Sequence, residues 1–205
     1  MDKHKRLIVV LFVIAVLALL FGCATPSRVV TRTSPDTQTD LSGRWNDTDA
    51  RIVAEEMIHD VLSRPWLQRF ERNALRRPVV IVGDVRNMSS EHIDTSPFIR
   101  SMERELINNG TVRFVAGDAV REKIRQERLE QQVHADEATA ARLGAETGAD
   151  FMLQGSIVSM TDAVDGTRAV TYIINLDLID IETTEIVWIG NTEIKKIIEL
   201  QRYSW

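Results

Sequence analysis

The sequence predicts an α+β fold, with helices packed on one small mixed β-sheet. Apolar residues recur at helical spacing in residues 46–64, whereas residues 151–198 hold three β-rich runs separated by turn signals. Helical and extended patterns are therefore mixed early and followed by a terminal antiparallel meander. No repeat of 20–50 residues is visible, so we expect one globular domain.

Residues 1–22 have the layout of a secretory signal peptide. Basic residues near the N-terminus precede an unbroken apolar run, Leu7–Phe21, which is shorter than the roughly 20 residues of a membrane-spanning helix. The next residues are Gly22 and Cys23, the single cysteine of the chain. Two alternatives are an uncleaved signal anchor and an ordinary secreted protein with a free thiol.

The four residues Leu20–Cys23 resemble the lipobox of bacterial lipoproteins, although Phe21 stands where a smaller residue is usual. The resemblance implies that Cys23 becomes the lipidated first residue of the mature protein, which also explains a lone cysteine in an exported chain. Ala24 follows where an aspartate would favour the inner membrane, so we expect an outer-membrane protein that faces the periplasm.

Residues 23–45 are predicted to form a flexible tether, because they hold too few apolar side chains to offset the entropy of ordering. Fully extended, this segment reaches at most ~80 Å, and as a flexible coil it spans ~25–30 Å. Leu41 and Trp45 are expected to pack on the domain, which we place at residues 46–205.

The composition excludes several classes of protein. The chain has a net charge of −5, and the first 22 residues contribute +2, which leaves about −7 beyond them. An acidic chain without a basic stripe does not indicate nucleic-acid binding. One cysteine excludes a disulfide-stapled domain and a site with several thiolate ligands in one chain.

The domain is expected to begin with a helix capped by Asn46 or Asp47 and ended by Pro65. The apolar stripe of this helix consists of Val53, Met57, Ile58, Val61 and Leu62. A second, shorter apolar face follows at Trp66, Leu67 and Phe70.

The continuous apolar run Val79–Val82 predicts a strand covered on both faces, and residues 83–95 predict a polar loop. Ser96 is the expected N-cap of the next helix, with Pro97 at its first position. Its core-facing residues are expected to be Phe98, Ile99, Met102, Leu106 and Ile107. Asn109-Gly110 then ends the helix, and a short strand is expected over Thr111–Val115.

Two more helices are expected before the sheet is completed, at residues 119–132 and 137–147. The first is highly charged, so we expect it to be half exposed. Strands are expected at residues 151–160, 169–181 and 185–198, and Asp165-Gly166 is a strong signal for a hairpin turn.

Residues with chemical potential are few. Glu56 and His59 form one Glu-x-x-His pair, but di-iron bundles need two such motifs and additional glutamates, so a solvated helix edge is the better interpretation. His92, with the neighbouring carboxylates, is weak support for an acid–base or metal cluster, and a loop that caps the next helix is favoured. The sequence has no Gly-x-Ser-x-Gly or His-Glu-x-x-His motif. We therefore expect no enzymatic activity, no metal and no cofactor.

Several segments together resemble the LpoB family. They are residues 78–82, Asn87, the run Ser-Glu-His-Ile-Asp-Thr at 90–95, residues 114–115, and residues 148–157. The resemblance implies a fold similar to the N-terminal domain of TolB. It also implies a non-enzymatic regulator, in the periplasm, that binds and activates a bifunctional class A penicillin-binding protein, which synthesises peptidoglycan. We expect it to act as a monomer.

The polar loop is our candidate partner-binding surface, because polar loops on rigid scaffolds often carry binding. The candidate residues are Asn87, Ser90, Glu91, His92 and Asp94. The alternative is that this loop only caps the helix that follows. The tether is shorter and less proline-rich than in enterobacterial LpoB proteins, so its reach to a synthase is in question.

Two other functions are open. The hairpin around residues 178–186 and the strand at residues 155–157 are also similar to CsgG, a secretion-channel lipoprotein. The connection at residues 162–168 is too short for the long, lipid-facing strands that a channel subunit must add. The third possibility is a generic TolB-like module that binds another envelope protein.

Overall fold

The computed structural model describes residues 4, 12, 30–34, 37–134 and 147–199. The chain divides into two units, Met1–Thr37 and Gln38–Trp205. Every helix and strand with defined bounds lies in the second unit. None of the helices that the structure describes is both long and apolar enough to cross a membrane.

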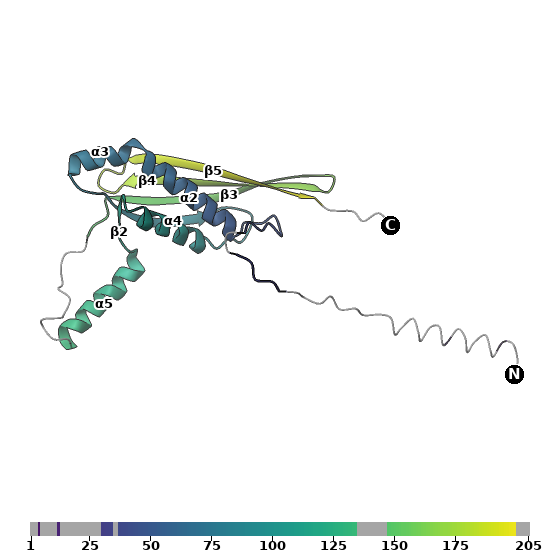
Figure 1. The fold of residues 1–205 in the computed structure, drawn as a ribbon, viewed down its shortest axis with the longest axis horizontal. Helices are drawn as coiled ribbons and strands as arrows, with labels where there is room; N and C mark the ends of the chain where they lie inside the picture. Colours follow the sequence, from purple (N-terminus) through teal and green to yellow (C-terminus); the bar gives the residue numbers. More distant parts are fainter. Residues whose placement is uncertain (1–3, 5–11, 13–29, 35–36, 135–146, 200–205) are drawn as a thin grey trace. The chain divides into compact units, whose positions relative to one another are not determined.

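One five-stranded mixed sheet forms the centre of the second unit, with the strand order β2-β1-β3-β4-β5 (Figure 1). The strands are β1 (Val79–Asn87), β2 (Arg113–Phe114), β3 (Phe151–Val164), β4 (Thr167–Asp180) and β5 (Ile186–Glu199). β1 is parallel to both β2 and β3, while β3, β4 and β5 form an antiparallel meander. The predicted α+β class and mixed sheet are confirmed.

The helices are α2 (Asp47–Ser63), α3 (Pro65–Ala74), α4 (Ser96–Asn109) and α5 (Asp118–His134). α2 and α4 contact each other; α2 also contacts β5, and α4 contacts β1 and β2. The side chains that meet in this core include Val53, Met57, Phe98, Met102, Leu153, Ile157, Tyr172, Ile174 and Leu176, all 2% exposed or less. Burying such side chains supplies most of the driving force for the fold.

The first helix begins as its sequence predicts. Asn46 and Asp49 form a capping box, in which each side chain accepts a hydrogen bond from the other residue's backbone N–H, at 3.1 and 2.9 Å. α2 ends at Ser63, and Pro65 opens α3. The predicted break at Pro65 is therefore a boundary between two helices.

β1 is longer than the predicted four residues, so the prediction of a loop from residue 83 is wrong for its first part. After a register shift between Val82 and Val85, the strand continues to Asn87. There it pairs with β3 from Gly155 to Ile157. Residues 83–87 are polar in composition, so their sequence carries no signal for a strand. They nevertheless form one, because their backbone groups pair with β3. Val79, Val80 and Val85 are buried, while Ile81 and Val82 are partly exposed, so the predicted cover on both faces is incomplete.

α4 and its flanks differ in small ways from the prediction. The N-cap is Thr95 rather than Ser96, and Ile107 is 55% exposed rather than part of the core. Gly110 ends the helix in the left-handed conformation, with φ at 71°. The strand expected over Thr111–Val115 is reduced to the two residues of β2, which pair with Val79 and Val80 of β1.

The C-terminal meander confirms its turn signals. Asp165 and Gly166 both have positive φ, at 46° and 87°, and form the two-residue turn between β3 and β4. All three strands begin or end beyond the predicted bounds. Ala163 and Val164 of β3, for example, pair with Arg168 and Thr167 of β4 next to this turn.

α5 contains the helix predicted at 119–132, and its apolar residues Val120, Ile124 and Leu129 are 41–54% exposed, as its charge predicts. The helix predicted at 137–147 lies almost entirely outside the described residues.

Asp150 joins the start of β3 to β1. Its carboxylate accepts hydrogen bonds from both terminal nitrogens of Arg76, each at 2.7 Å, and from the backbone N–H of Val79 at 2.8 Å. The Gly-Ala-Asp segment that carries part of the family resemblance therefore has a structural role in this chain.

Candidate functional site

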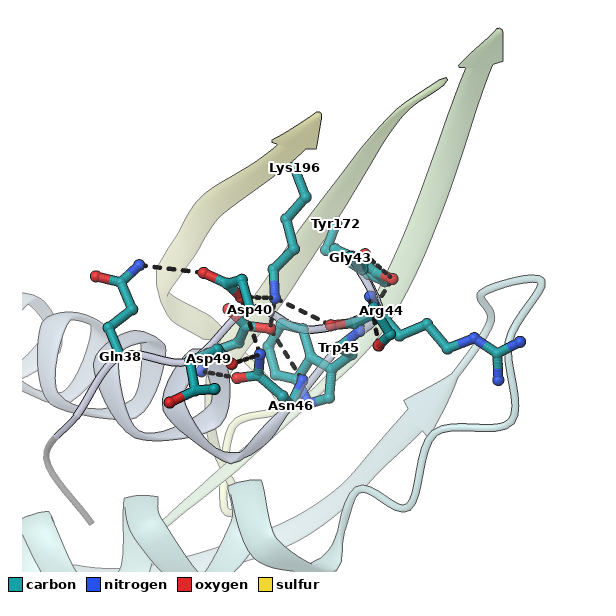
Figure 2. Close-up of polar contacts among 11 residues, drawn as sticks. Gln38, Asp40, Gly43, Arg44, Trp45, Asn46, Asp49, Tyr172 and Lys196 are labelled. Carbon is teal, nitrogen blue, oxygen red and sulfur yellow. Dashed lines mark hydrogen bonds and ion pairs between the residues drawn. The ribbon is translucent and has the colours of Figure 1, made fainter. Parts of the chain in front are cut away.

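Residues Gln38–Trp45, which we call the strap, precede α2 and are held by a buried lysine (Figure 2). The Lys196 ammonium of β5 donates to Asp40 Oδ1 and Asp49 Oδ2, both at 2.6 Å, and to the backbone oxygen of Arg44 at 2.9 Å. The side chain of Lys196 is 7% exposed. A buried ammonium without partners is energetically costly. The strap and α2 together supply the partners of the Lys196 ammonium.

Trp45 and Tyr172 fix the end of the strap. The Trp45 backbone N–H donates to the Tyr172 hydroxyl at 3.0 Å, and this hydroxyl lies 3.4 Å from the carbonyl oxygen of Gly43. The Trp45 ring lies edge-on to Phe98 and Tyr172, with centroids 6.1 and 5.7 Å apart. The prediction that Trp45 packs on the domain is confirmed. The same prediction is wrong for Leu41, which is 93% exposed.

Gly43 has little space for a side chain. Its φ is 66°, and a Cβ at this position would meet the side chain of Ile198 at 2.4 Å. The strap therefore lies directly against the end of β5.

The charges of this cluster shift one another's protonation. Burial acts to lower the pKa of Lys196, but Asp40 and Asp49 outweigh burial and hold this pKa above its ordinary value of 10.5. The hydrogen bond from Lys196 is the main reason that the pKa of Asp40 lies below its usual range. Burial raises the pKa of Asp49, and the hydrogen bond from Lys196 acts against this rise.

A hollow of about 580 Å³ lies between the strap, the 88–95 loop, α2 and β4. It brings together Ser90, Glu91, His92 and Asp94, four of the five residues that the sequence indicated as partner contacts. The other lining residues are Ser42, Arg44, Trp45, Asn46, Asp47, Ala50, Ile93, Pro97, Arg168, Val170 and Ile198. This hollow is the candidate functional site.

Asn87 does not line the hollow but shapes the loop beside it. Its side-chain amide donates to the Glu91 carbonyl at 2.7 Å and accepts from the Ser89 backbone N–H at 3.0 Å. The Ser90 backbone N–H donates to the hydroxyl of Ser159 on β3 at 3.1 Å. The loop is thus held in one conformation against the sheet.

Two carboxylates of the hollow already have structural tasks. Asp94 accepts from the Ser96 backbone N–H at 3.0 Å, which supports the helix-capping interpretation of the loop and keeps the pKa of Asp94 low. Burial is the main cause that raises the pKa of Tyr172 above its ordinary value, and the nearby Glu91 carboxylate adds to this effect.

The other residues considered from the sequence lie elsewhere. Glu56 and His59 are exposed on α2, as a solvated helix edge requires, and Cys23 is outside the described residues. No group of three or more His, Cys, Asp or Glu residues in the described part of the chain is placed to hold a metal ion.

Sequence reasoning missed Arg44, Arg168 and Lys196. For Lys196 a signal exists, because it shares a strand face with Ile194 and Ile198, where a charge needs a buried partner. The partners of Lys196 lie more than 140 residues away in the chain, so the pairing itself has no local signal.

The chain is similar to a known protein family over most of its length. A family model described as the peptidoglycan-synthase activator LpoB matches residues 49–194. No curated protein matches the chain significantly.

Among solved structures, the chain is similar to the LpoB C-terminal domains of Escherichia coli and Salmonella enterica, with 16% and 17% identity and TM-scores of 0.44 and 0.42. Each comparison covers 72% of this chain and 99% of the other. It is also similar to lipoprotein GNA1162 of Neisseria meningitidis, with 14% identity, a TM-score of 0.38, and coverage of 62% and 88%.

Replacing Lys196 by methionine should destabilise the domain by about 3–5 kcal/mol, because it leaves the buried Asp49 carboxylate without its ammonium partner. Denaturant unfolding measures this change. The matched control is Lys195→Met on the exposed side of the same strand, for which we expect a change within about 0.5 kcal/mol. Equal effects of the two substitutions would contradict the role assigned to Lys196.

The free energy of unfolding should fall as the pH rises above about 10. Lys196 and Tyr172 both have pKa values above their ordinary 10.5 and 10.0. The folded state then binds more protons than the unfolded state, so stability is complete below these ordinary values and is lost as pH rises towards the folded pKa values. Denaturant titrations between pH 8 and 11.5 test this. Tyr172→Phe should flatten the alkaline slope, and an unchanged slope would disprove its contribution.

Proposed function

This chain belongs to the LpoB family of peptidoglycan-synthase activators, and we propose that it binds and activates a class A penicillin-binding protein without being an enzyme itself. The family match carries this proposal, because residues 49–194 extend from the first turn of α2 into β5. The match therefore includes at least part of every helix and strand that the structure describes in the domain.

The second part of the proposal is an anchor in the outer membrane. Cleavage before Cys23 and lipidation of this cysteine would hold the domain on the periplasmic side, where the synthase builds the cell wall. The lipobox resemblance of Leu20–Cys23 and the polar composition of the following residues support this arrangement. We propose that the protein acts there as a monomer.

The strap shortens the part of the tether that is free to extend. The predicted tether ends at residue 45, but the compact unit starts at Gln38, and Asp40 and Trp45 contact the domain. About 15 residues then separate the lipid from the domain, and their maximum reach is ~50 Å rather than ~80 Å. The synthase must therefore be met close to the outer membrane, unless the strap detaches.

The channel alternative gains no support from the hairpin. β3 and β4 are joined by Asp165 and Gly166 alone, which leaves no room for an inserted, lipid-facing segment. A ring-sized assembly of the detergent-extracted protein would nevertheless favour a channel over a regulator. A generic envelope module would be favoured if crosslinking in intact cells recovered a partner other than a peptidoglycan synthase.

Purified residues 24–205 should raise the glycan-polymerisation rate of the cognate synthase, because activation needs binding rather than the membrane anchor. The measurement is the rate of lipid II consumption by the synthase with increasing amounts of the activator. The heat-denatured activator is the control. An unchanged rate at saturating activator, with a synthase that is active alone, would refute the proposed function.

Replacing Cys23 by serine should release the protein from the outer membrane, because the residue that carries the lipid is lost. Membrane fractionation and labelling with radioactive palmitate measure this effect. The control is Ala24→Ser, which leaves the cysteine in place. Palmitate incorporation that persists in Cys23→Ser would show that the anchor lies elsewhere.

A further inference from the structure

Two arginines border the candidate site, and their guanidinium groups have no partner among the described residues. Arg44 of the strap and Arg168 of β4 line both the hollow described above and an adjoining hollow of about 780 Å³ beside the β3–β4 turn. In the part of the chain that the structure describes, neither guanidinium takes part in an ion pair or hydrogen bond. In Figure 2 the Arg44 side chain extends away from the Lys196 cluster. Both cations are therefore available to a group from outside the chain.

The surface near these arginines includes apolar side chains. Ala163, Val164 and Ile198 line the adjoining hollow, and Val164 is 68% exposed. Arginine is one of the residue types that are enriched at protein interfaces and in their binding hot spots. A partner segment with an acidic residue beside apolar residues matches both features.

The acidic residues around the two hollows do not cancel this preference. Asp94 is engaged by the Ser96 backbone, and Asp47 lies in the first turn of α2, where the helix dipole stabilises a carboxylate. The third acidic residue of the first hollow, Glu91, lies near the Tyr172 hydroxyl. Among the described residues that line the adjoining hollow, Asp165 is the one acidic residue, so the two arginines outnumber it. At this hollow an incoming carboxylate therefore meets two cations and one anion.

Arg44 is held at this place by the strap. Its carbonyl oxygen accepts from Lys196 at 2.9 Å, and the next residue, Trp45, is bound to Tyr172. Half of the cationic surface therefore comes from the end of the tether, and the other half comes from β4. The surface exists only while the strap lies on the domain.

We propose that Arg44 and Arg168, with the apolar side chains near them, form the docking surface for an acidic, apolar-flanked segment of the partner protein. This inference rests on the proposed function, in which the partner is a peptidoglycan synthase. A membrane surface fits less well, since a chain with a net charge of about −7 beyond the signal segment is repelled by anionic lipids. Contact with one local segment of the partner protein avoids repulsion by the net charge of this chain, because salt screens charges that lie more than about 10 Å apart.

The test is charge reversal in residues 24–205, with binding to the synthase measured by surface plasmon resonance. Arg44→Glu and Arg168→Glu should each weaken binding by about 10-fold or more, because a like charge then faces the partner's carboxylate. The matched control is Arg69→Glu, an exposed arginine on α3, for which we expect a change within about 2-fold. Raising the salt concentration should weaken synthase binding of the wild type more than that of a variant that carries both Arg44→Glu and Arg168→Glu.

Thermal unfolding shows whether each variant is folded, and Arg44→Ala and Arg168→Ala provide milder variants without an added charge. If the wild type binds and both reversals bind equally well, the docking surface is wrong and the proposed function stands. If the wild type does not bind the synthase, both proposals are wrong. If the reversals lose binding only to phosphatidylglycerol vesicles, the surface belongs to a membrane and the docking proposal is again wrong.

Discussion

The buried ammonium of Lys196 is the interaction on which the functional end of this domain depends. A charge on the core-facing side of a strand requires partners, and it finds them in Asp49 of α2, in Asp40, and in the carbonyl of Arg44. Strand, helix and strap are therefore fixed together by one group. Because the strap forms a wall of the candidate hollow, the shape of the site follows from this contact.

The same contact connects the end of the predicted tether to the site. In a lipoprotein with a purely flexible tether, the anchor sets only how far the domain travels. Here Ser42 and Arg44, near the end of the predicted tether, also line the surface that we propose for docking. If the strap detached from the domain, the tether would reach further. The same change would remove Arg44 from the docking surface. Reach and binding are thus opposed in this architecture.

The sequence predicted much of the fold because the relevant signals are local. The Asn46 cap, the break at Pro65 and the Asp165-Gly166 turn depend on neighbours a few residues away, and all three are found. Four of the five loop residues chosen from the sequence meet in one hollow. The errors, such as the early end assigned to β1, occur where a polar segment is made into a strand by its pairing with distant β3.

The sequence by itself determined the α+β class, the family and the loop that borders the site. Only the tertiary structure decided that the strap belongs to the domain and that Arg44 and Arg168 line one surface. The physical reason is the distance along the chain. Lys196 meets Asp40 and Asp49 across some 150 residues, and no local propensity encodes a contact that exists only when the sheet and α2 have packed.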